Sequence, residues 1–88
     1  MPTLCMFFGI IVRMFAEING KHNTPHIHAK YNDNEVVMDF EGNVLEGSLP
    51  SKQLKMLSAW VVMHDDELKA NWELLSNGEH FFKIDPLK

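Results

Sequence analysis

The chain is poor in cysteine and in basic residues. Its single cysteine, Cys5, cannot form an internal disulfide, so the sequence is compatible with a reducing compartment. Eight Lys and Arg residues stand against twelve Asp and Glu residues, giving a net charge of −4. No basic field therefore draws the chain onto nucleic acid, which makes DNA binding an unfavoured interpretation and leaves RNA contact to a local patch.

Long apolar runs are also missing. The first fifteen residues are mostly apolar, but they include Arg13 and do not open on a basic segment. A signal peptide needs that basic segment, and a membrane span needs about 20 apolar residues. We therefore expect a cytoplasmic protein that does not insert into a membrane.

The length of 88 residues predicts a single domain over residues 1–88 with one modest hydrophobic core. No internal repeat or linker divides it. In residues 7–15, both the odd and the even positions are apolar, apart from Gly9 and Arg13. This pattern predicts one strand whose two faces are both covered.

Three further segments show the alternation of strands with one apolar face. In residues 26–31, Ile27, Ala29 and Tyr31 alternate with His26, His28 and Lys30. Residues 36–41 alternate again, and residues 44–47 form a short strand after a Gly-Asn turn. The sequence therefore predicts an antiparallel meander of three to four strands.

A helical period follows the strands. Apolar side chains and one histidine recur every three or four residues, at Leu54, Leu57, Val61, His64, Leu68, Trp72 and Leu75. We predict one long or kinked C-terminal helix packed on one face of the sheet, hence an α+β fold. The apolar tail at 81–87 is expected to lie against the outer surface of the first strand.

Turn geometry predicts a polar cluster on the other sheet face. If Asp33 and Asn34 are the two loop residues of a hairpin, His28 lies opposite Asp39 and His26 lies opposite Glu41. Matching the apolar positions of the first strand adds two charged residues to this face. The predicted cluster is Arg13, Glu17, His26, His28, Asp39 and Glu41.

Three chemistries fit this cluster, and the residues by themselves leave them open. His26, His28, Asp39 and Glu41 form a ligand set for a divalent metal such as zinc. In metal-free RNA cleavage, His26 and His28 would share acid and base duty, with Asp39 to orient an imidazole and Arg13 to hold a phosphate. The third reading is a solvated face of cross-strand pairs, each contributing about 0.2–1 kcal/mol.

Four segments together resemble a known bacterial family. They are Phe-Phe-Gly-Ile-Ile-Val-Arg-Met at 7–14, His-Asn-Thr-Pro-His-Ile-His-Ala-Lys-Tyr at 22–31, Leu-Glu-Gly-Ser-Leu-Pro at 45–50 and Ala-Asn-Trp-Glu at 70–73. Taken in order, they resemble the family called domain of unknown function 4160. The family usually shows Asp-His-Asn-Pro-Pro where this chain has Lys-His-Asn-Thr-Pro at 21–25, so the acidic group of that loop is absent here.

The resemblance implies a partner. Such proteins are often encoded beside a small protein of the domain of unknown function 2442 family, in an arrangement like a toxin–antitoxin pair. We therefore expect a toxin-like component whose histidine face carries RNA chemistry or binds a partner. The alternatives are a metal-binding protein using His26 and His28, and an interaction module or homodimer that buries an apolar face of Phe7, Ile11 and Phe15.

Overall fold

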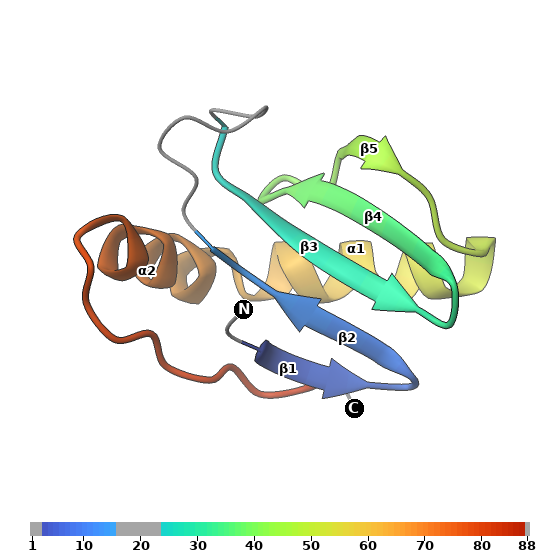
Figure 1. Ribbon diagram of the computed structural model, residues 1–88. Coiled ribbons are helices and arrows are strands. Elements are labelled where there is room, and N and C mark those ends of the chain that lie inside the picture. The colour runs from blue at the N-terminus through green and yellow to red at the C-terminus, as the bar shows by residue number, and fades with distance from the viewer. Residues whose placement is uncertain (1–2, 16–23, 88) are drawn as a thin grey trace.

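The computed structural model describes residues 3–15 and 24–87 and shows an antiparallel sheet followed by helices (Figure 1). Its strands lie side by side in chain order. The predicted α+β meander is therefore confirmed, but the sheet has five strands and there are two helices. The elements are β1 (Thr3–Phe7), β2 (Ile10–Arg13), β3 (His26–Tyr31), β4 (Asn34–Asp39), β5 (Val44–Gly47), α1 (Ser51–Met63) and α2 (Asp65–Ser76).

The additional strand arises at the first apolar run. Residues 7–15 were predicted as one strand, but the chain turns back at Phe8 and Gly9, whose φ angles are 48° and 80°. Two consecutive positive φ angles are typical of a type I′ hairpin turn, whose twist matches that of the flanking strands. Phe8 is a bulky residue in a conformation that favours Gly or Asn, so the sequence pattern concealed this turn.

The turn also changes the face that Phe7 occupies. Phe7 is buried, with its ring centroid 5.5 Å from that of Trp60 in α1, and does not share an exposed face with Ile11. Met6 instead lies opposite Ile11 in the neighbouring strand. The predicted interface of Phe7, Ile11 and Phe15 is therefore wrong in its first member.

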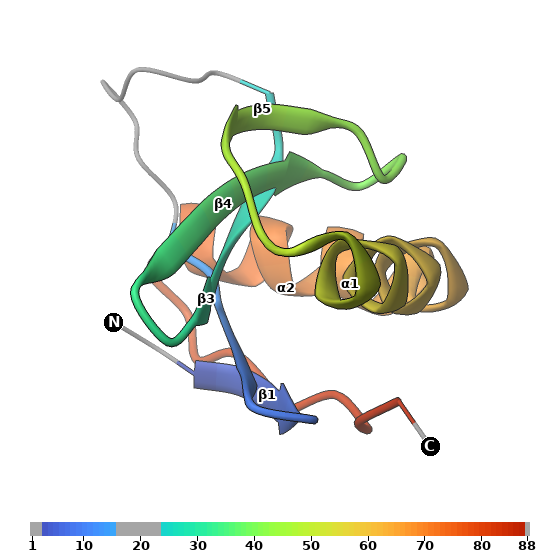
Figure 2. The ribbon, with the colours of Figure 1, turned by 90° about the vertical axis from the view of Figure 1, so that its right-hand side faces the viewer.

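Both helices lie on one side of the sheet, as the side view in Figure 2 shows. Leu57, Val61 and Leu68 are fully buried, while Leu54 and Trp72 are partly buried against the same core, in agreement with the helical stripe. The strands contribute alternate residues, chiefly Ile10, Val12, Met14, Ile27, Ala29, Val36 and Met38. Cys5 also packs in this core, and its burial raises the pKa of the thiol.

The predicted single helix is divided at His64, which has a φ of −112°. Its imidazole Nδ1 donates a hydrogen bond of 2.9 Å to the carbonyl oxygen of Trp60. Three acidic residues, Asp65, Asp66 and Glu67, then occupy the first turn of α2, where negative charge is favoured by the helix dipole. Within the described ranges, no helix is long and apolar enough to cross a lipid bilayer.

The C-terminal tail follows β1, but on the helix side of the sheet, which corrects the predicted position on the outer surface (Figures 1 and 2). The amide N–H of Ile84 donates to the carbonyl oxygen of Leu4 at 3.1 Å. The indole N–H of Trp60 donates to the carbonyl oxygen of Asp85 at 2.8 Å. Ile84 is buried, so the tail closes the core between β1 and α1.

Asn71 of α2 holds the beginning of this tail. Its side-chain amide donates to the carbonyl oxygen of Phe82 at 2.8 Å and accepts from the amide N–H of Phe82 at 2.9 Å. The Asn71 side chain is fully buried, so neither bond competes with water in the folded protein. The sequence pattern contained no signal for this contact, because a polar residue on a helix is usually assigned to the solvent side.

We expect Asn71→Ala to lower the free energy of unfolding by about 2 kcal/mol, because two hydrogen bonds are lost and a backbone donor and acceptor are left without them. Urea unfolding followed by circular dichroism measures this change. The control is Asn77→Ala at an exposed position, for which the expected change is within about 0.5 kcal/mol. Equal effects of the two substitutions would contradict the role of Asn71.

Leu57→Ala is expected to lower the free energy of unfolding by about 2–5 kcal/mol, because it opens a cavity in the centre of the core. The matched control is Lys55→Ala on the exposed side of the same helix, which should change stability by less than about 0.5 kcal/mol. Thermal unfolding of the two variants tests the assignment of the buried helix face. A stable Leu57 variant would show that face to be wrong.

Candidate functional site

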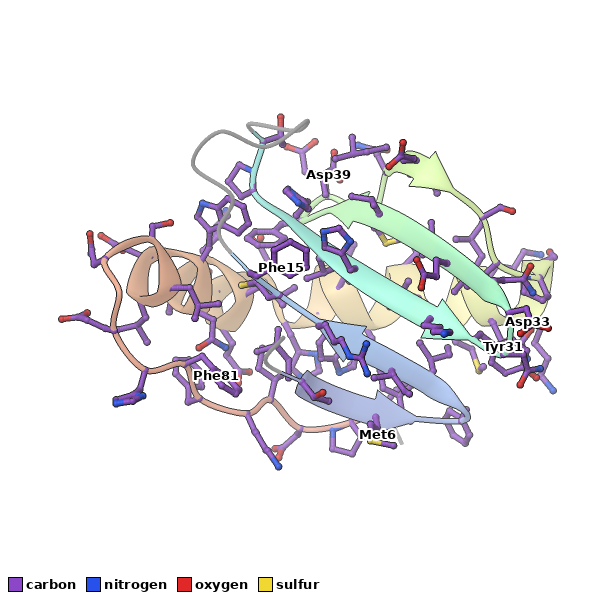
Figure 3. The ribbon with its side chains drawn as sticks, viewed as in Figure 1. Met6, Phe15, Tyr31, Asp33, Asp39 and Phe81 are labelled. Carbon is purple, nitrogen blue, oxygen red and sulfur yellow. The ribbon has the colours of Figure 1, made fainter. Side chains whose placement is uncertain are left out.

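The sheet face that the helices do not cover carries His28, one of the two histidines predicted from the sequence. Side chains alternate along a strand, so the residues between the core positions point to this second face. Figure 3 looks onto it and labels Met6 and Phe15. We call it the outer face, made of Met6, Ile11, Arg13, Phe15, His28, Lys30, Glu35, Val37 and Glu46.

The register of β3 and β4 differs from the predicted one by two residues. The hairpin loop consists of Asn32 and Asp33, with Asn32 at a φ of 52°, a conformation that Asn tolerates better than most residues. His28 therefore lies opposite Val37, and His26 lies opposite Asp39. A shift of two does not turn the strand over, so His28 stays on the face predicted for it, while the predicted cross-strand partners of both histidines are wrong.

Arg13 and His28 lie on the same face, as the matching of apolar positions predicted, and the structure makes them direct neighbours across β2 and β3. The ring of Phe15 stacks on His28, with centroids 4.4 Å apart and an angle of 18° between the planes. The Nε of Arg13 is buried and makes no hydrogen bond within residues 3–15 and 24–87. The described part of the site thus has a guanidinium beside a stacked imidazole and phenyl ring.

His26 lies in a different environment from His28. It is only 1% exposed, and its Nδ1 donates to the carbonyl oxygen of Thr24 at 2.6 Å. Its ring centroid is 5.1 Å from that of His28 and 5.2 Å from that of Trp72 in α2. Packing therefore encloses His26, whereas His28 is partly exposed on the outer face although its Nε2 is buried.

The carboxylate of Asp39 serves the connection between β4 and β5. It accepts hydrogen bonds from the amide N–H of Glu41 at 3.0 Å and of Asn43 at 2.8 Å, and from the Asn43 side chain at 3.3 Å. Asp39 therefore stabilises the turn between β4 and β5 through its side chain.

Glu41 is exposed and borders a different hollow, of about 550 Å³, together with Phe40 of the same connection and Val62 of α1. The predicted set of His26, His28, Asp39 and Glu41 is therefore not gathered at one point. Among the described residues, no three His, Cys, Asp or Glu side chains are grouped as metal ligands. Glu17, which was predicted to belong to this cluster, lies outside the described residues.

A groove of about 380 Å³ runs across the outer face. Cations line it from β2 and β3, through Arg13 and Lys30, and anions line it from β4 and β5, through Glu35 and Glu46. Sequence reasoning missed both glutamates as members of the site, although they have the same strand alternation as Val37. The predicted register concealed them, because it placed Asp39 where Val37 lies.

Fold and site together define a small α+β protein with one sheet face covered by helices and a second face that carries a groove of mixed charge. The profile of the family described as Domain of unknown function (DUF4160) matches residues 9–73, and the chain belongs to this family. The match extends from the β1–β2 turn into α2, so it includes the outer-face residues of β2 to β5. Neither the curated proteins nor the solved structures contain a match to the chain.

Gly47 determines how closely β5 approaches β4 at the groove. Its φ is 76°, and a Cβ placed on it would collide with the carbonyl oxygen of Glu35. Gly78, after α2, has a similar φ of 73° but no atom within 4 Å of such a Cβ. An alanine at Gly78 would therefore meet backbone strain alone, whereas an alanine at Gly47 would meet the same strain and a steric clash as well.

We expect Gly78→Ala to cost roughly 1 kcal/mol from the left-handed conformation, and Gly47→Ala to cost more than this because β5 must also move away from β4. Chemical denaturation measures both values. A Gly47 variant no less stable than the Gly78 variant would contradict the close packing of this edge.

Proposed function

We propose that the protein is the binding component of a toxin–antitoxin-like module and that its outer face docks a protein surface. The observation that carries this proposal is Arg13, whose buried Nε has no hydrogen-bond partner among the described residues and which borders a groove. A buried polar group without a partner lowers the stability of the folded chain, so its presence points to a role outside the folded monomer. A carboxylate of a docked protein would supply the missing acceptor.

The composition of the outer face supports a protein as the occupant. Ile11 and Phe15 are partly exposed apolar residues, Val37 is apolar and almost fully buried, and the charged residues Arg13, Lys30, Glu35 and Glu46 line the same groove. Protein interfaces combine an apolar centre with polar groups of both signs, and arginine and aromatic residues contribute most of their binding energy. An RNA backbone carries only negative charge and would be repelled by the two glutamates and by the net charge of −4.

The state of the histidines also favours binding over RNA cleavage. Cleavage requires an acid and a base that both reach the substrate. His26 is enclosed by packing and bonded to the backbone, and the Nε2 of His28 is also buried. In the part of the chain that the structure describes, neither imidazole thus presents an exposed Nε2 for the acid–base mechanism considered from the sequence.

The proposal is tested with a purified small protein of the domain of unknown function 2442 family as the probe. Calorimetry should detect a complex, and Arg13→Glu should weaken it at least about tenfold, because charge pairs at an interface become repulsive. Lys55→Glu is the matched control, since Lys55 is exposed on α1, on the helix side of the sheet. A complex that both variants weaken equally, or no complex at all, would refute docking of this partner on the outer face.

RNA is examined in the same samples with a fluorescently labelled single-stranded RNA. We expect no saturable change in anisotropy at physiological salt. Saturable binding that Phe15→Ala abolishes, combined with no protein complex, would show that the outer face binds RNA by base stacking and would overturn the proposal.

A further inference from the structure

The charges of the outer face are separated into two halves of the sheet. Arg13 lies on β2 and Lys30 on β3, whereas Glu35 lies on β4 and Glu46 on β5. The boundary between cations and anions therefore falls between β3 and β4, and β3 is the third of five strands in the sheet.

The strand register also aligns these charges in rows. In one row Arg13 pairs with His28, His28 with Val37 and Val37 with Glu46. In the second row Ile11 pairs with Lys30 and Lys30 with Glu35. Each row thus has a cation on the β2–β3 half and an anion on the β4–β5 half, at the same height along the strands.

We infer that the surface docked on the outer face is the outer face of a second copy of this chain. The inference rests on the proposed function, because both require this face to dock protein. The copies are related by a two-fold axis that runs parallel to the strands, between β3 and β4. Such a rotation exchanges β2 with β5 and β3 with β4, and it preserves the height of each residue along the strands.

This two-fold rotation places the cations of each copy opposite the anions of the other copy. Arg13 of each copy comes to face Glu46 of the other, and Lys30 faces Glu35, so each contact occurs twice. His28 faces Val37 of the second copy across the axis. Rotations that place cations over cations lack this match, so electrostatics selects the two-fold arrangement.

The distances between packed sheets allow these contacts. Sheets stacked face to face lie about 10 Å apart, a gap that an Arg side chain and a Glu side chain span together. Neighbouring strands lie about 4.8 Å apart, so three strand spacings separate Arg13 from Glu46 within one chain by roughly 14 Å. His28 and Val37 lie between the two residues within one chain, and a mixture of two oppositely charged variants distinguishes a contact between copies from one within a chain.

The extent of the face sets the expected affinity. The rotation superposes the four strands β2 to β5, which cover a width of about 19 Å, so the interface is below the roughly 800 Å² per partner of a standard protein interface. We therefore expect a dimer that dissociates in the micromolar range and weakens as salt is added.

Sedimentation equilibrium of four samples tests the inference: the wild-type chain, Arg13→Glu, Glu46→Arg, and an equimolar mixture of the two variants. The wild type should dimerise, and each variant alone should dimerise at least about tenfold more weakly, because like charges then face each other twice. In the mixture, the glutamate introduced into one variant faces the arginine introduced into the other, so both contacts join opposite charges and dimers should form again. Circular dichroism verifies that both variants are folded, and Lys55→Glu should dimerise like the wild type.

Each other outcome counts against the second copy. A wild-type chain that stays monomeric up to millimolar concentration overturns the inference, as does a dimer that both variants retain or a mixture that fails to recover. If the chain is monomeric but the small protein used as the probe still binds in an Arg13-dependent manner, the proposed docking function stands without the homodimer. If neither association occurs, both proposals fail.

Discussion

Two helices of 13 and 12 residues pack on one face of the sheet, and this one-sided coverage determines the rest of the structure. At a rise of 1.5 Å per residue, each helix is about 20 Å long or shorter, so together they cover a single face of five strands. The break at His64 divides this layer into two helices, and the C-terminal tail fills the part of the same face beside β1. The tail reaches the core because Trp60 donates its indole N–H to Asp85 and Ile84 fills the space beside β1.

The same coverage gives the two histidines of β3 different environments, although they are two residues apart and share a strand face. His26 is at the beginning of β3, where Trp72 reaches its ring and the carbonyl oxygen of Thr24 accepts its proton. His28 is one pleat further on, beside Arg13 and beneath Phe15. A His-x-His spacing is therefore insufficient evidence for a pair that acts together, because the burial of each ring depends on elements far away in the chain.

Membership of the DUF4160 family places the chain among proteins related by sequence, but function has to be argued from the site. The outer face combines apolar side chains with charges of both signs, and the sheet register divides those charges into a cationic and an anionic half. Such a division suits a protein surface better than a polyanion. It also makes the face complementary to itself, which connects the proposed docking role to a second copy of the chain.

The sequence by itself determined which residues of β3, β4 and the helical stripe face the core, because alternation and helical period are local properties of the chain. It also predicted that Arg13 and His28 share the outer face. Tertiary structure decided the register, since a slip of two residues preserves every face and exchanges Asp39 for Val37 opposite His28. It likewise decided the turn at Phe8, the helix break at His64 and the position of the tail, because these depend on the space left by distant elements rather than on neighbouring residues.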